Sequence, residues 1–207
     1  MVEHPPTEQG RATRERIVAA TAQLVAERGI AATSLDDVLA ATRASKSQLY
    51  HYFEDRAALL RAVVVHNTES VISHVGPLDS WKAIRSWFDS MVEAQTARRG
   101  RSGCPIGSLV SQLAEADPKA RLTLAASFAR WEGQLRDGLH TMQVAGKLDR
   151  SANPTELATA TMAAIQGGLL LTQTKRDPSQ LAIALDAAYS HLRTHAARTR
   201  ERGVAAR

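Results

Sequence analysis

The sequence contains few of the residues that stabilise secreted or membrane proteins. Its single cysteine, Cys104, excludes an internal disulfide framework and is typical of a reducing compartment. No apolar run approaches the roughly 20 residues that a membrane-spanning helix needs. The N-terminal segment MVEHPPTEQGRATRER also lacks the apolar core of a signal peptide. We therefore expect a soluble, cytoplasmic protein with no membrane partner.

Motifs of common enzyme chemistry are missing as well. The chain contains no G-x-S-x-G elbow, no H-E-x-x-H motif and no G-x-x-x-x-G-K-[ST] phosphate loop. His191 and His195 have the spacing of two metal ligands on a helix, but histidines in such an Arg-rich terminal segment are more often solvated. We expect no catalytic residue, no metal site and no cofactor.

The formal net charge of +5 suggests nucleic-acid binding, but its distribution weakens that inference. Residues 1–60 carry seven Lys or Arg and eight Asp or Glu, whereas residues 191–207 carry five Arg and one Glu. Much of the basicity thus lies in a C-terminal tail, and we expect residues 198–207 to be disordered. Net charge alone does not identify the partner.

Helix signals divide the chain into about nine segments, and no alternating strand pattern is present. Proline follows a capping residue at Asp117-Pro118, Asn153-Pro154 and Asp177-Pro178, which is typical of helix starts. Cys104-Pro105 offers a further start. We expect an all-α fold with helices at about 13–28, 34–42, 45–52, 55–75, 80–98, 105–115, 118–145, 154–174 and 178–197.

Aromatic residues are scarce, and three of the nine lie in four consecutive positions, as Tyr50, Tyr52 and Phe53. They belong to the third predicted helix, which is separated from the second by the short connection TRA at 42–44. Two short helices at this spacing match a helix-turn-helix, whose second helix enters the DNA major groove. Leu49 and Phe53, four residues apart, are expected to face the core.

The exposed face of this second helix carries groups that can contact DNA. Gln48 can pair bidentately with adenine, and Lys46 can donate to guanine or to a phosphate. Tyr50 carries a phenol at the end of an apolar ring, from which it can reach a phosphate. The candidate DNA-binding residues on this helix are Ser45, Lys46, Ser47, Gln48, Tyr50 and His51.

A wider pattern over residues 13–60 identifies a family. Its middle part has the spacing E.G...T, at Glu27, Gly29 and Thr33. Its end is similar to the pattern LY.HF, at Leu49, Tyr50, Tyr52 and Phe53. On these motifs the segment resembles the DNA-binding domain of TetR-type transcriptional repressors.

The resemblance implies a helix-turn-helix domain over residues 1–58, with 1–10 disordered, and a ligand-binding and dimerisation domain over 59–207. It also implies that Thr33, Tyr50 and Arg56, the last at a position usually occupied by lysine, contact phosphates. The partners implied are double-stranded DNA with a palindromic operator, a second copy of the chain and a small-molecule effector. Whether the protein represses or activates transcription stays open.

One departure from the family pattern concerns the turn. Family members usually have AGVS where this chain has Thr42-Arg43-Ala44-Ser45, so Arg43 replaces a glycine that commonly adopts a left-handed conformation. A non-glycine residue there costs about 1 kcal/mol. Arg43 can instead supply an additional DNA contact, and both interpretations stay open.

Residues 154–174 carry no charge after Glu156 until the segment ends, although a surface helix normally keeps a charged face. Together with the last helix, this segment resembles the four-helix dimer interface of the family. The interface candidates are Ala160, Ala164, Gly167, Gly168, Leu171, Leu181, Leu185 and Ala188. Burial inside one monomer is the alternative explanation.

Large side chains on the middle helices are candidates for an effector pocket. They are Trp87, Met91, Phe128, Trp131 and Met162, with Gln166 as a polar group and Cys104 nearby in SGCPIGSL. This set favours an apolar or aromatic effector over a highly charged one. Cys104 beside a predicted helix start is either a redox or electrophile sensor or a buried structural thiol.

The sequence therefore predicts a ligand-responsive DNA-binding regulator. A helical dimeric protein-interaction module without sequence-specific DNA binding is the alternative, and salt-dependent preference for a palindromic duplex would discriminate between them.

Overall fold

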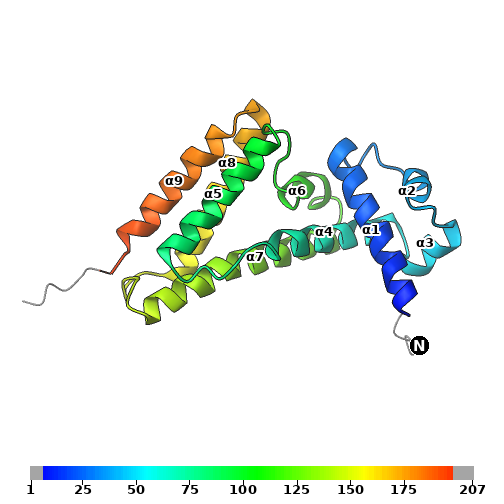
Figure 1. The fold of residues 1–207 in the computed structure, drawn as a ribbon. Coiled ribbons are helices and arrows are strands. Elements are labelled where there is room, and N and C mark those ends of the chain that lie inside the picture. Colours follow the sequence, from blue (N-terminus) through cyan, green and yellow to red (C-terminus); the bar gives the residue numbers. More distant parts are fainter. Residues whose placement is uncertain (1–6, 198–207) are drawn as a thin grey trace, which may run out of the picture. The chain divides into compact units, whose positions relative to one another are not determined.

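The structure, a computed structural model, describes residues 7–197 and confirms the all-α fold (Figure 1). Within this range no β-strand forms, and one isolated antiparallel bridge joins Leu148 and Ala196. The described helices are α1 Glu8–Arg28, α2 Leu35–Thr42, α3 Lys46–Tyr52, α4 Arg56–Ile72, α5 Trp81–Ala97, α6 Gly107–Leu113, α7 Pro118–Val144, α8 Pro154–Lys175 and α9 Ser179–Thr194.

The first helix begins five residues earlier than expected, at Glu8 instead of Thr13. Its N-cap is Thr7, whose hydroxyl accepts a hydrogen bond from the Gly10 amide at 3.1 Å. Residues 8–10, which we expected to be disordered, therefore form the first turn of α1. The rest of the expected disorder, at residues 1–6 and 198–207, lies outside the described residues.

Helix starts at prolines follow the prediction in two cases. Pro118 and Pro154 are the first residues of α7 and α8. Pro178 instead precedes α9, because Asp177 Oδ1 accepts from the Ser179 amide at 2.9 Å. The predicted helix start at Pro105 is wrong, because α6 begins at Gly107. The amide of Gly107 donates to Cys104 Sγ at 3.2 Å.

The chain packs into two compact units. The N-terminal unit comprises the chain up to His74 together with Cys104–Trp131, and the C-terminal unit comprises Val75–Gly103 together with the chain from Glu132. These units do not coincide with the predicted functional division at residues 58 and 59, which stays a prediction.

The core of the N-terminal unit is built around α1 and α4. Ile17, Val63 and Val64 are fully buried. Two ion pairs join α4 to the N-terminal part of α7, Arg61–Asp117 at 2.7 Å and Glu69–Arg130 at 2.6 Å. The hydrogen bond from Arg61 is the main cause of a lowered pKa of Asp117, so this carboxylate is charged at neutral pH.

In the C-terminal unit, α8 packs closely along α9, and α5 also packs against α9 (Figure 1). The Tyr189 hydroxyl donates to the Trp81 carbonyl at 3.3 Å, and Arg85 pairs with Asp186 at 2.6 Å. Both contacts join α5 to α9, and α7 contributes the fully buried Leu135, Leu139 and Met142 to the core of this unit.

Residues 195–197, which follow α9, are held by the connection between α7 and α8. The amide of Asp149 donates to the His195 carbonyl at 2.8 Å, and the amide of Ala197 donates to the Lys147 carbonyl at 3.0 Å. Gln143 Nε2 donates to three carbonyls of the same connection, including that of Ala152 at 2.9 Å. Residues 195–197 are therefore fixed to this connection by backbone hydrogen bonds.

Two adjacent glycines of α8 have opposite surroundings. A Cβ added at Gly168 would lie 2.9 Å from Leu181 Cδ1 and 3.0 Å from Ala184 Cβ, both on α9. A Cβ added at Gly167 would meet nothing within 4 Å, and this residue is exposed. Gly168 thus permits the close approach of α8 and α9, while Gly167 has no such role within the monomer.

We expect Gly168→Ala to be less stable than Gly167→Ala by about 1–3 kcal/mol, which is the usual cost of overpacking. Both changes gain the same helix propensity, about 1 kcal/mol, so in the monomer the difference isolates the packing against α9. Urea unfolding of the two variants, at equal protein concentrations low enough for the chain to be monomeric, measures it. Equal free energies of unfolding would show that α8 and α9 do not pack this closely.

Candidate nucleic-acid interface

The two helices of the helix-turn-helix begin with the same hydrogen-bonding device. At α2, Ser34 Oγ accepts from the Asp37 amide at 3.1 Å, and Asp37 Oδ2 accepts from the Ser34 amide at 2.9 Å. At α3, Ser45 and Gln48 make the same reciprocal pair, at 3.1 and 2.9 Å. Each capping box satisfies two amides that a helix start would otherwise leave without partners. The hydroxyl of Ser34 also lowers the pKa of Asp37.

The turn between the helices confirms the expected left-handed residue. Arg43 has φ 53° and ψ 24° as the C-cap of α2, and its side chain is exposed. The next residue, Ala44, is buried, and its amide donates to Thr42 Oγ1 at 3.3 Å. The turn is thus fixed on its inner side, and the strain at Arg43 is of the order of 1 kcal/mol.

The side chains of α3 point inward and outward as the sequence predicts. Leu49 and Phe53 are 1% and 2% exposed, while Tyr50 is 47% exposed. Tyr52 is half-buried, and its ring meets the edge of the His51 ring with centroids 4.9 Å apart. The outward face carries the exposed side chains of Ser45, Lys46, Ser47, Gln48, Tyr50 and His51.

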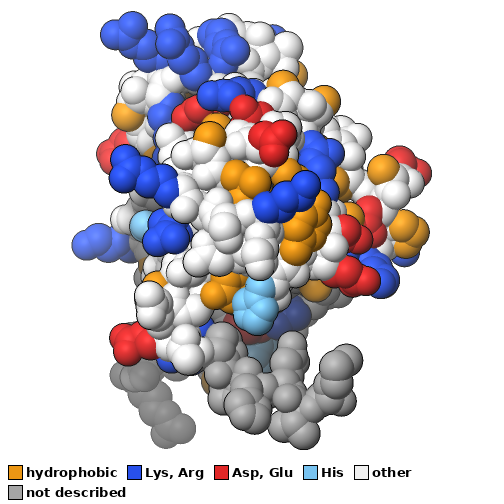
Figure 2. Space-filling model, turned by 90° about the vertical axis from the view of Figure 1, so that its right-hand side faces the viewer, with side chains coloured by type: hydrophobic (Ala, Val, Ile, Leu, Met, Phe, Trp, Pro, Cys, Tyr) orange, Lys and Arg blue, Asp and Glu red, His pale blue; other side chains and the backbone are white. Residues whose placement is uncertain are grey.

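Charge on this side of the molecule is mixed. Figure 2 looks onto the side where α2 and α3 lie in Figure 1, and Lys and Arg side chains are spread over it among carboxylates. The candidate interface is therefore not distinguished by a large, purely basic surface, as the balanced charge of residues 1–60 indicated.

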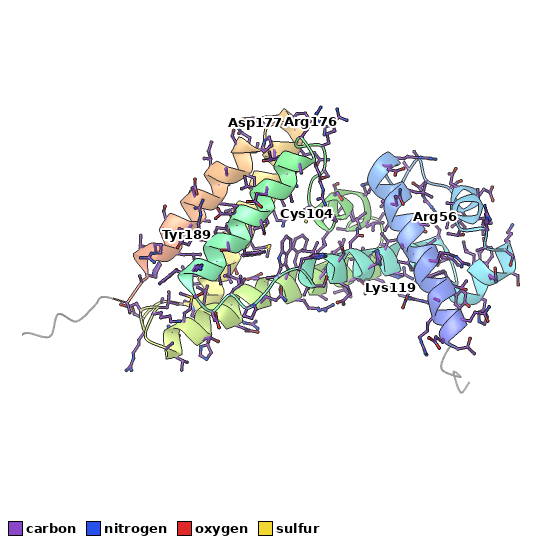
Figure 3. All side chains as sticks on the ribbon, in the orientation of Figure 1. Arg56, Cys104, Lys119, Arg176, Asp177 and Tyr189 are labelled. Atoms are coloured by element: carbon purple, nitrogen blue, oxygen red, sulfur yellow. The ribbon has the colours of Figure 1, made fainter. Side chains whose placement is uncertain are left out.

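Two residues that the resemblance assigned to phosphates donate hydrogen bonds to the protein's own backbone. Thr33 is buried, and its hydroxyl donates to the Gly29 carbonyl at 2.8 Å. Arg56 Nη2 donates to the carbonyl of Thr33 at 2.9 Å and also to that of Ile30 (Figure 3). Both side chains thus organise the connector between α1 and α2, and their contact with phosphates stays a prediction.

The dimer candidates separate into two groups. Gly168, Leu181, Leu185 and Ala188 are buried within one chain, as the monomer alternative proposed. Ala160, Gly167 and Leu171 are exposed, and Ala164 is half-buried. Two apolar residues that the sequence did not single out, Leu170 and Ile183, are 64% and 65% exposed. An exposed apolar face therefore remains on α8 and α9.

The effector candidates are mostly interior residues. Trp87, Cys104, Trp131 and Met162 are buried, whereas Met91, Phe128 and Gln166 are half-buried. Gln166 Nε2 lies 3.6 Å from Met162 Sδ one turn away on α8, which is the contact the structure shows within this set. Cys104 is a buried thiol close to α6 (Figure 3).

Several buried polar atoms have no hydrogen-bond partner within the described chain. They are Trp131 Nε1, Gln134 Oε1, Gln95 Oε1 and Ser102 Oγ. Of these, only Trp131 was a candidate from the sequence. Gln95 could have been noticed, since it follows Ile84 and Phe88 on the apolar face of α5. Atoms of this kind are where a bound molecule gains hydrogen bonds.

Two surface grooves lie within the separate units, and neither is lined by the seven effector candidates. One, of about 550 Å³, lies between α1 and α4 around Arg14, Val18 and Val65. The other, of about 240 Å³, lies between α5 and α9 around Phe88 and Leu185. Across residues 7–197, no group of three or more His, Cys, Asp or Glu could hold a metal ion, and no helix is long and apolar enough to cross a membrane.

Comparison with known proteins gives two family matches. Residues 17–63 match the family described as bacterial regulatory proteins, tetR family. Residues 80–187 match the C-terminal domain of LmrA/YxaF-like transcriptional regulators.

Individual relatives agree with these matches. An uncharacterised HTH-type transcriptional regulator of Lactococcus lactis subsp. lactis, from the lacX 3' region, is 30% identical over 176 residues, covering 81% of this chain and 86% of the relative. The HTH-type transcriptional repressor DhaR of a Mycobacterium species is 23% identical over 174 residues, covering 81% and 86%. The crystal structure of reduced E. coli NemR superposes with a TM-score of 0.75 at 20% identity, covering 89% of this chain and 97% of NemR.

The strained turn gives a prediction for Arg43. We expect Arg43→Gly to be unchanged or up to about 1 kcal/mol more stable, because glycine removes the left-handed strain but adds entropy to the unfolded chain. If Arg43 contacts a phosphate, the slope of log affinity for duplex DNA against log salt becomes shallower by about 0.9 per protomer, or about 1.8 for a homodimer. Thermal unfolding and salt titrations measure the two effects.

Arg176 provides the matched control, because it has φ 56° and ψ 34° as the C-cap of α8. Arg176→Gly relieves similar strain and should leave the salt slope unchanged. An unaltered slope in Arg43→Gly would show that Arg43 makes no DNA contact.

Proposed function

Because this chain belongs to the TetR family of bacterial regulatory proteins, whose members are helix-turn-helix transcriptional regulators, we propose that it is a cytoplasmic repressor without catalytic activity. It binds a palindromic operator as a homodimer, and a small, largely apolar effector releases it. The observation that carries the proposal is α3, a doubly capped helix with Leu49 and Phe53 buried and a polar face exposed. DhaR, one of the relatives, is described as a repressor.

The exposed face of α3 divides into base-contacting and phosphate-contacting residues. Lys46, Ser47 and Gln48 lie in its first turn, where a recognition helix contacts base edges. Tyr50 and His51 lie further along and contact the backbone, as does Arg43 in the turn before the helix. Ser45 acts by fixing the helix start, since its hydroxyl is already used in the cap.

Gln48 has two roles in this proposal. Its Oε1 accepts from the Ser45 amide at 2.9 Å, and an amide oxygen has a second lone pair with which it can accept from adenine. The same side chain therefore holds the start of α3 and contacts a base.

Dimerisation uses the apolar face that α8 and α9 leave exposed. Ala160, Gly167 and Leu171 lie on the exposed side of α8, together with Leu170. A glycine with open space above it lets a second helix approach closely, and exposed leucines are buried by that approach. A homodimer also places two copies of α3 for the two halves of a palindrome.

The effector is bound by the interior side chains of the helices that follow α4. Trp87, Met91, Phe128 and Met162 provide apolar and aromatic surface, and Cys104 and Gln166 are the further candidates. The unpartnered Trp131 Nε1 is a donor for an acceptor group on the effector. Binding shifts the dimer to a form in which the two α3 helices no longer fit both half-sites, so operator and effector weaken each other's affinity by the same factor.

A helical interaction module without DNA binding is not favoured, because both the helix-turn-helix match and the exposed polar face of α3 belong to DNA-binding proteins. Selection of bound duplexes from a random pool by the wild-type chain tests the proposal. Recovery of a palindromic sequence supports it. Recovery of no preferred sequence, or of one without twofold symmetry, would reject it.

Variants of Gln48 then test base recognition separately from capping. We expect Gln48→Ala to lose about 1–3 kcal/mol of discrimination at one base pair in each half-site. Gln48→Glu keeps an acceptor for the Ser45 amide, and so keeps the capping box, but loses the amide donor. Helix content by circular dichroism should fall slightly in the alanine variant alone, whereas base preference at that position should be lost in both. Unchanged preference in both variants would leave Gln48 as a cap only.

The proposed dimer face is tested by a charge. We expect Leu171→Glu to raise the dimer dissociation constant by at least about tenfold, because it places a carboxylate in an apolar interface. Leu122, on α7 and 60% exposed, is a matched exposed leucine on a different helix. Leu122→Glu should leave dimerisation unchanged in sedimentation equilibrium. Equal effects of the two changes would move the interface away from α8 and α9.

A further inference from the structure

The connector between α1 and α2, residues 29–33, is held by side chains from two other helices. The amide of Ile30 donates to Gln112 Oε1, on α6, at 3.1 Å. The carbonyl of the same residue accepts from Arg56 Nη2, on α4. Both backbone polar groups of Ile30 are thus satisfied by residues far along the chain, at 82 and 26 positions of separation.

The rest of the connector depends on this arrangement. Arg56 Nη2 also donates to the Thr33 carbonyl at 2.9 Å, and the Thr33 amide donates to the Ile30 carbonyl at 3.3 Å. Gly29 has φ 80°, a conformation that favours glycine. Ile30 and Thr33 are both buried, so a backbone group that loses its partner here has little access to water.

The two ends of the Gln112 amide have separate tasks. Oε1 accepts from the connector, whereas Nε2 donates to the Ser108 carbonyl of its own helix at 2.9 Å. The side chain is therefore fixed to α6 by one atom and to the connector by the other. The helix α6 has seven residues and is itself held by the buried side chains of Leu109 and Leu113. Ahead of its start, Asn67 Nδ2 donates to the Pro105 carbonyl at 3.0 Å.

We propose that Gln112 is a positioning residue for DNA binding, which makes the placement of α2 and α3 depend on the position of α6. The connector leads directly into the N-cap of α2, and α2 leads through the Arg43 turn into α3. A displacement of α6 removes the acceptor of the buried Ile30 amide and so favours a different connector. The dependence is reciprocal, because a helix-turn-helix held on DNA favours the α6 position that keeps this bond.

The effect on DNA affinity rests on the proposed function. Loosening the connector leaves every group on the face of α3 in place and only makes the binding conformation less populated. A fall in that population lowers the apparent affinity by the same fraction. The loss therefore has the size of one hydrogen bond per protomer, about three- to tenfold, which becomes about ten- to a hundredfold for a dimer on both half-sites.

Three substitutions at Gln112 separate the two bonds. Gln112→Met and Gln112→Ser lose both, whereas Gln112→Glu keeps an acceptor for Ile30 and loses only the donor to Ser108. Gln112 is exposed, so none of the three should prevent folding. Gln23 on α1, an exposed glutamine whose Nε2 donates to Glu27 at 3.0 Å, provides the control Gln23→Met.

Amide hydrogen exchange and DNA affinity are measured on each full-length variant, the latter with the duplex selected by the wild-type chain. In Gln112→Met and Gln112→Ser, we expect Ile30 to exchange at least about tenfold faster and the dimer to bind the duplex about ten- to a hundredfold more weakly. Gln112→Glu should restore Ile30 protection and bring the affinity to within about twofold of wild type. Gln23→Met should change neither.

Each other outcome overturns the proposal in a recognisable way. Unchanged Ile30 exchange in the methionine and serine variants would mean that Gln112 does not hold the connector. Faster exchange with unchanged affinity would make the bond purely structural. A weakened affinity that Gln112→Glu does not restore would show that the loss does not come from the bond to Ile30. If the wild-type chain selects no duplex, the proposed function fails and the DNA role of Gln112 falls with it, although the exchange data would still decide the hydrogen bond itself.

Discussion

Burial of Leu49 and Phe53 is the constraint on which the DNA-binding end of this protein depends. A helix of seven residues is not stable by itself in water, so α3 exists only where tertiary contacts hold it. Arg14 adds to this anchor, because its guanidinium carbon lies 5.2 Å from the centre of the Phe53 ring. With these side chains fixed inward, the 3.6-residue period places the polar residues of α3 outward. Of the three aromatic residues concentrated here, Phe53 belongs to this anchor, whereas Tyr50 is exposed and Tyr52 is half-buried.

Local signals made most of the fold predictable. Capping residues and prolines located helix starts at Ser80, Pro118 and Pro154, because those signals act within one turn of the chain. Pro105 failed for a related reason, since a proline permits a helix start but does not require one. The facing of α3 was also predictable, because Leu49 and Phe53 are spaced for a single helical face.

The roles of Thr33 and Arg56 could not be predicted in the same way. Their partners are backbone carbonyls, which carry no sequence signal, and Arg56 lies 26 residues from Ile30. The glycines of α8 show a similar limit. Gly167 and Gly168 look equivalent in the sequence, and only the position of α9 distinguishes them. Sequence periodicity identifies an apolar helix, but it does not tell which part of its surface is covered within the same chain.

The backbone hydrogen bonds of residues 195–197 have a practical consequence for protein engineering. Ala197 is tied to the carbonyl of Lys147, and the preceding residues pair with the connection between α7 and α8. A purification tag or fluorescent label attached after residue 197 would leave these bonds intact. A truncation at the end of α9, at Thr194, would remove the partners of Lys147 and Asp149 and expose their backbone groups to solvent. Shortened versions of this protein should therefore retain the chain through Ala197.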